Sequence, residues 1–142
     1  MACPYFFPTA RLENNSWVIP PRLPIGDAYT GECRAGRTAF QPSAEVVRAT
    51  CNVGYARESC GYFPLDAPAD AVRFHIAEHR GELIRIQYVF EKDCWPRKHG
   101  MLDYTANARE FSPSIDPILA KQAAAFVESY LRRCDQALAT KA

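Results

Sequence analysis

Four cysteines in the first half of the chain are the residues best suited to chemistry. Cys3, Cys33, Cys51 and Cys60 are separated by 29, 17 and 8 residues. Thiolates bind zinc and iron–sulfur clusters, and in oxidising compartments cysteines pair as disulfides. The same half holds seven of the 11 prolines and shows no sustained hydrophobic period. A segment with so little regular structure of its own needs a cross-link to offset the entropy that it loses on ordering.

The spacing of these cysteines favours a [4Fe–4S] cluster over a zinc ion. Structural zinc sites are typically built from C-x₂₋₄-C pairs, and the sequence contains none. A cluster accepts ligands from well-separated loops, although neither common ferredoxin spacing is present here. We therefore expect Cys3, Cys33, Cys51 and Cys60 to bind one [4Fe–4S] cluster that acts in electron transfer or redox sensing. The open alternative is a zinc- or disulfide-stabilised protein-interaction domain without redox activity.

Residues beside the cysteines are suited to enclose such a cluster. Proline lacks an N–H group, the residues after Cys51 offer backbone donors, and aromatic rings exclude water. The expected surrounding residues are Pro4, Asn52, Gly54, Tyr55, Tyr62 and Phe63, with Tyr5, Phe6 and Phe7 as further flanking aromatics.

Two enzymatic patterns are weaker. His75 to His79 spells H-x-x-E-H, a zinc-protease string that requires a helix, but the alternation around it predicts a strand. On a regular strand the two histidines share a side and lie about 13 Å apart, too far to hold one ion. Cys94 and His99 could form a nucleophile–base pair, but their spacing is weak evidence and a solvated basic turn is the favoured explanation. The sequence favours a cofactor-binding module over an enzyme.

The second half of the chain predicts the elements that must position this site. Residues 72–76 and 84–90 alternate as two half-buried strands around a turn at 79–81, and residues 100–105 predict a third strand after a loop at 94–99. The polar face, with Arg73, His75, Arg85 and Gln87, either faces solvent or forms the floor on which the cysteine-rich half packs.

A long amphipathic helix of about 24 residues is predicted after Ser114, its expected N-cap, with Pro117 in the first turn. A short helix is predicted over 43–51, after Pro42, and residues 17–26 are expected to run extended because of their prolines. The predicted fold is α+β in a single domain, 1–142. Residues 1–65 form an irregular Pro/Cys-rich half, packed on a small antiparallel meander of about three strands and one long C-terminal helix in residues 66–142.

Composition limits the classes of partner. The 142 residues carry a net charge of +1, which offers no surplus for nucleic acid or anionic lipid. No apolar run approaches the about 20 residues of a membrane-spanning helix, and the start lacks the pattern of a signal peptide. We expect a cytoplasmic protein that binds neither nucleic acid nor membrane. The sequence identifies no redox partner protein and no oligomeric state.

Overall fold

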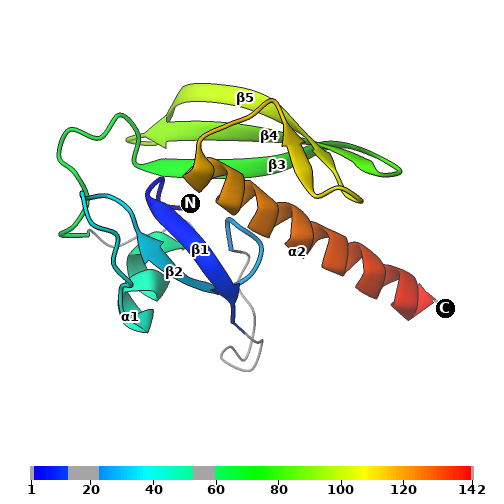
Figure 1. The fold of residues 1–142 in the computed structure, drawn as a ribbon, viewed down its shortest axis with the longest axis horizontal. Coiled ribbons are helices and arrows are strands. Elements are labelled where there is room, and N and C mark those ends of the chain that lie inside the picture. The colour runs from blue at the N-terminus through cyan, green and yellow to red at the C-terminus, as the bar shows by residue number, and fades with distance from the viewer. Residues whose placement is uncertain (1, 13–22, 53–59, 142) are drawn as a thin grey trace.

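The computed structural model describes residues 2–12, 23–52 and 60–141, and only the backbone of 136–141. The chain is α+β, with a two-stranded sheet, a four-stranded antiparallel sheet and the long C-terminal helix α2 (Pro117–Lys141) (Figure 1). The predicted α+β class and the predicted long helix are confirmed. Helix α2 is capped by Asp116, whose carboxylate accepts hydrogen bonds from the backbone N–H groups of Ile118 (3.0 Å) and Leu119 (3.2 Å), and not by Ser114 as expected.

The larger sheet has four strands, not about three. Its order is β3 (Ala71–Arg80), β4 (Leu83–Lys92), β5 (Trp95–Thr105) and β6 (Glu110–Ser112). The predicted loop at 94–99 is mostly strand, because β4 and β5 are joined by a tight turn whose residues Asp93 and Cys94 both have positive φ. Pro96 is tolerated close to the start of β5, where the pairing of β4 with β5 is irregular.

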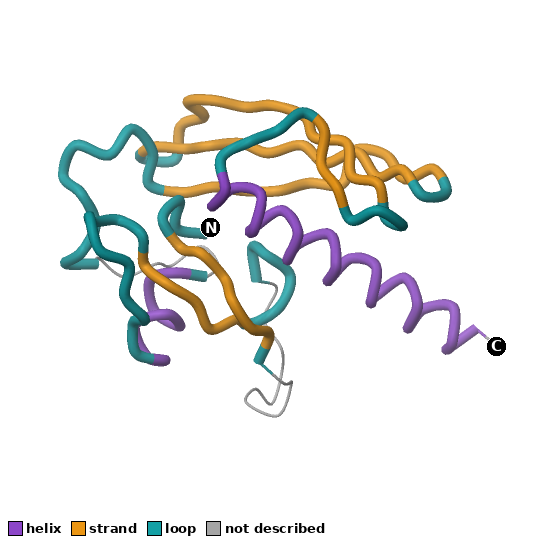
Figure 2. The backbone as a smooth tube through the Cα atoms, viewed as in Figure 1, coloured by secondary structure: helices purple, strands orange, loops and turns teal. Residues whose placement is uncertain are grey.

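One face of this sheet carries the core. Its pairs include Val72 with Phe90 and Ile76 with Ile86, and side chains that are paired across antiparallel strands point to the same side. Helix α2 and strands β1 and β2 lie on this same side of the sheet (Figures 1 and 2). Two apolar clusters result, one with Ala2 and Phe6 against Val72, the other with helix residues against Ile84 and Ile86. The polar face is therefore not the floor for the N-terminal residues.

The first 65 residues contain regular structure where they are described. Strand β1 (Phe6–Arg11) pairs antiparallel with β2 (Tyr29–Cys33). A short helix α1 (Ala44–Val46), N-capped by Ser43, continues into one wide π-helical turn, η2 (Val47–Cys51). The predicted helix over 43–51 is thus confirmed in place, although half of it is wider than an α-helix. Of the segment expected to run extended, residues 17–22 lie outside the described residues.

A bulge in β3 changes the placement of the two histidines. The pairing with β4 shifts between Ile76 and Glu78, so that His75 pairs with Gln87 whereas His79 pairs with the buried Ile84. The histidines therefore lie on opposite faces of the sheet, and the expectation that they share a side is wrong. His79 instead faces helix α2, where its Nδ1 lies 2.9 Å from the Tyr130 hydroxyl.

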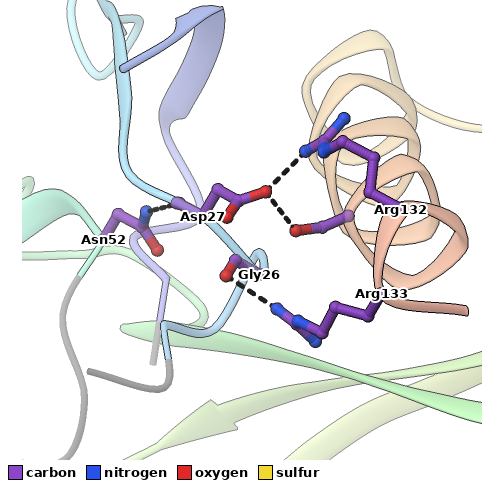
Figure 3. Close-up of polar contacts among 6 residues, drawn as sticks. Gly26, Asp27, Asn52, Arg132 and Arg133 are labelled. Atoms are coloured by element: carbon purple, nitrogen blue, oxygen red, sulfur yellow. Dashed lines mark hydrogen bonds and ion pairs between the residues drawn. The ribbon is translucent and has the colours of Figure 1, made fainter. Parts of the chain in front are cut away.

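Loop residues Gly26 and Asp27 fasten the N-terminal half to helix α2 (Figure 3). The Asp27 carboxylate accepts hydrogen bonds from Ser129 and Arg132, and Arg133 donates to the Gly26 carbonyl at 2.8 Å. Gly26 has a φ of +93°, and a Cβ at this position would collide with Ser129. Burial alone would raise the pKa of Asp27, but the hydrogen bonds from Ser129 and Arg132, and the charge of Arg132, hold it below its ordinary value.

Stability should therefore depend on Asp27 at acidic pH. Folding lowers the pKa of Asp27. The stability that Asp27 contributes is therefore complete above the pKa of the unfolded chain, about 3.9, and is lost as the pH falls from there through the lower pKa of the folded protein. We expect Asp27→Asn to lower the free energy of unfolding by about 1–3 kcal/mol near neutral pH and to flatten its decrease at acidic pH. Urea unfolding between about pH 6 and pH 3 measures both effects.

Asp103→Asn is the matched control, since Asp103 pairs with Arg85 (2.9 Å) on the exposed face of the sheet. Exposed ion pairs contribute at most about 1 kcal/mol. Equal pH profiles for Asp27→Asn and the unmodified protein would contradict the fastening role of Asp27.

Candidate metal centre

All four candidate ligands line one cavity. Its volume is about 330 Å³, within the lower part of the roughly 300–1,000 Å³ range of cofactor pockets. The described lining residues are Cys3, Tyr5, Phe6, Cys33, Ala35, Thr50, Cys51, Cys60, Tyr62, Phe63, Pro64, Leu65, Ala67, Asp70 and Lys92. Segments that are distant in the sequence thus bring their cysteines to one cavity, whose described wall is largely apolar.

Cys3 is positioned by main-chain contacts on both sides. The preceding residue, Ala2, forms two backbone hydrogen bonds with Val72 of β3 (3.1 and 2.9 Å), and the Cys3 N–H donates to the Cys51 carbonyl at 2.8 Å. Backbone hydrogen bonds therefore connect the edge of the sheet to the N-terminal residues, and these to the end of η2. These bonds fix the separation between two of the four cysteines.

The other cysteines are also held through their backbones. Cys33, at the end of β2, exchanges two hydrogen bonds with Phe40 (2.7 and 3.3 Å), which closes the loop between them. Cys51 ends the π-helical turn, is buried, and lies 3.6 Å from the Thr50 hydroxyl. The Cys60 carbonyl accepts a hydrogen bond from the Phe63 N–H (3.2 Å) across a turn.

The four cysteines share one cavity without forming a compact ligand group for a single ion. In the described part of the chain, no three Cys, His, Asp or Glu side chains lie close enough to hold a single metal ion. All six cysteines are thiols in the structure. Cys94 and Cys134 do not belong to the described lining of the cavity: Cys94 is exposed at the β4–β5 turn, and Cys134 is half-buried on α2.

The expected surrounding residues have mixed outcomes. Tyr62 and Phe63 line the cavity, whereas Pro4 is not among its described lining residues. Asn52 lines a separate cavity of about 150 Å³ and donates a hydrogen bond to the Asp27 carbonyl at 2.8 Å. Gly54 and Tyr55 lie outside the described residues.

Sequence reasoning missed two charged residues in the cavity wall, Asp70 and Lys92. Asp70 lies just before β3 and Lys92 is the last residue of β4, so only the pairing of these strands brings them together. The one sequence signal that could have indicated them is their position, because Asp70 and Lys92 are charged residues just outside the two predicted strands. Tyr5 also lines the wall. The pKa of its phenol is raised, mainly by burial and to a smaller extent by the nearby Cys3 and Asp66.

Comparisons of this chain with protein-family models, curated proteins and solved structures found no significant match. Within the described residues, no helix is both long and apolar enough to span a membrane.

Gln122 of helix α2 is the side chain that ties the Cys3 segment to the core. It is 1% exposed, and its amide nitrogen donates to the carbonyls of Cys3 (2.8 Å) and Phe6 (2.7 Å). Because α2 packs on the sheet, this amide holds the backbone of the Cys3 segment in a defined position relative to the sheet.

Gln122→Leu should therefore destabilise the protein. Leucine is of similar size, but it removes the amide donor from both carbonyls. The Cys3 carbonyl keeps the Phe6 N–H (3.1 Å), whereas the buried Phe6 carbonyl loses the Gln122 donor. An unsatisfied buried polar group costs about 1–3 kcal/mol. We expect a loss of that size in the free energy of unfolding, measured by urea denaturation. The exposed Asp135→Ala on the same helix should change it by less than about 0.5 kcal/mol, and equal effects for both variants would exclude the proposed role of Gln122.

Proposed function

We propose that this protein binds one [4Fe–4S] cluster through Cys3, Cys33, Cys51 and Cys60 and acts in electron transfer or redox sensing. The observation that carries the proposal is that these four cysteines, from four separate segments, all line one cavity. Cysteine is a common core residue, but unrelated core thiols have no reason to share a cavity of cofactor size.

The geometry favours a cluster over a single zinc ion. A structural zinc ion needs all its sulfur ligands at about 2.3 Å from one point, and no three described ligands are arranged for that. In a [4Fe–4S] cluster each thiolate bonds a different iron, so the ligands encircle a volume. A cavity of about 330 Å³ lined by four cysteines suits the second arrangement.

The surroundings support electron transfer in particular. Four thiolate ligands leave no iron open to a substrate, which disfavours catalysis at the metal. Among the lining residues, Phe6 and Cys51 are 1% and 6% exposed, whereas Tyr62 is 60% exposed, so the cavity has both buried and exposed wall residues. A cluster placed here would be shielded by the core and still lie close to the surface, where a redox partner protein could approach.

Single Cys→Ser substitutions test the ligand set. In protein purified without oxygen, we expect about four iron and four sulfide per chain with broad visible absorption. Serine at position 3, 33, 51 or 60 should lower the iron content to less than about one per chain, because one corner of the cluster loses its thiolate. Iron and acid-labile sulfide assays with a visible spectrum measure this.

Cys94→Ser and Cys134→Ser are the matched controls, since neither cysteine is among the described lining residues of the cavity. Both variants should keep the full iron content. Full iron content in all six variants, or zinc in place of iron, would refute the proposed ligand set.

Removal of the metal should loosen the N-terminal half selectively. Metal binding contributes folding free energy to segments that it cross-links, whereas the sheet and α2 share their own apolar cluster. After chelation we expect the backbone amides of Cys3 and Cys33 to exchange hydrogen at least about tenfold faster, about 1.4 kcal/mol in opening free energy. Amides of β4 and β5 should change little.

Hydrogen exchange with mass spectrometry measures both regions in one sample. Reconstitution with iron and sulfide should restore the slow exchange. Unchanged exchange at Cys3 and Cys33 after complete iron removal would show that no cross-link through the metal holds this half.

A further inference from the structure

Lys92 is the one lysine or arginine among the described residues that line the cysteine cavity. It is the last residue of β4 and is half-buried. Its ammonium group donates a hydrogen bond to the Ala67 carbonyl at 2.8 Å, which holds it against the segment that follows Cys60. Lys92 is therefore a fixed positive charge in the wall of the proposed cluster site.

Asp70 places a negative charge in the same wall. Its backbone N–H donates to the Glu91 carbonyl at 2.8 Å, and its carboxylate accepts a hydrogen bond from the Asp93 N–H at 3.0 Å. The two charges stand at neighbouring strand ends, one on β4 and one just before β3. The remaining described wall consists mainly of apolar and aromatic side chains, so it screens charge less than water does.

Charges in such a wall act on the reduction potential. When an oxidised cluster accepts one electron from a donor, no bond breaks, no proton moves, and the charge of the cluster and its thiolates becomes one unit more negative. A nearby cation stabilises the reduced state more than the oxidised state, and a nearby carboxylate does the reverse.

We infer that Lys92 raises the reduction potential of the cluster and that Asp70 lowers it, so that this pair sets the redox poise of the protein. The inference rests on the proposed cluster. Lys92 is a tuning residue and not a ligand, because its ammonium group has no lone pair to offer a metal. The hydrogen bond to the Ala67 carbonyl holds its charge in place.

A potentiometric titration without oxygen, with dithionite as the electron donor, tests this inference on the full-length protein. Lys92→Met should lower the reduced-to-oxidised ratio at a fixed potential about tenfold, equivalent to about 59 mV for a one-electron couple. Lys92→Arg keeps the charge and should titrate like the unmodified protein. Asp70→Asn keeps an acceptor for the Asp93 N–H and should shift the potential in the opposite direction.

Iron and sulfide content distinguishes a failure of the proposed cluster from a failure of the proposed role of Lys92. If the unmodified protein binds no cluster, the proposed function and this inference both fail. If every variant holds a full cluster and Lys92→Met has an unchanged potential, only the role of Lys92 is refuted. Lys92→Gln keeps a donor for the Ala67 carbonyl without the charge, so a lowered potential in this variant supports the charge effect even if Lys92→Met loses its cluster.

Discussion

Helix α2 and the N-terminal half both bury their apolar side chains on the same face of the four-stranded sheet. The helix covers the end with Ile84 and Ile86, and the N-terminal residues cover the end with Val72 and Phe90. Phe74 and Tyr88 contact both apolar clusters. Because this face is shared, the N-terminal half packs beside α2 and along the edge of β3. This position brings the cysteine-bearing segments next to the ends of β3 and β4, where the cavity lies.

The N-terminal half has too few elements to hold its shape by packing alone, and polar contacts supply the remainder. Ala2 continues the sheet by pairing with Val72, Gln122 fixes the Cys3 segment, and Asp27 connects the loop before β2 to helix α2. These contacts come from the sheet, from the N-terminal part of the helix and from its middle. The four cysteines lie where the segments held in this way face one another, so a metal there would join segments that the polypeptide already brings together.

The sequence predicted those elements whose signal is local. The alternation over residues 72–90 and the helical spacing after Pro117 each lie within one segment, and both elements are present. The β1–β2 pair was not predicted, because its partners are far apart and include Pro8 and Gly31, which are poor strand residues. The β3 bulge and the Asp93–Cys94 turn depend on strand pairing in the same way. The shared location of the four cysteines was predicted from residue type, whereas Lys92 and Asp70 required the register of β3 with β4.

The most direct test of the cluster is the native mass of the protein, purified without oxygen and kept folded during mass spectrometry. One measurement distinguishes an iron–sulfur cluster, a zinc ion and disulfides, because each changes the mass of the chain by a different amount. We predict a single species heavier than the polypeptide by four iron and four sulfur atoms, which reverts to the mass of the bare chain on acidification. A native mass equal to the chain with one zinc ion, or to the chain less the hydrogens lost in disulfide formation, would contradict a cluster at Cys3, Cys33, Cys51 and Cys60.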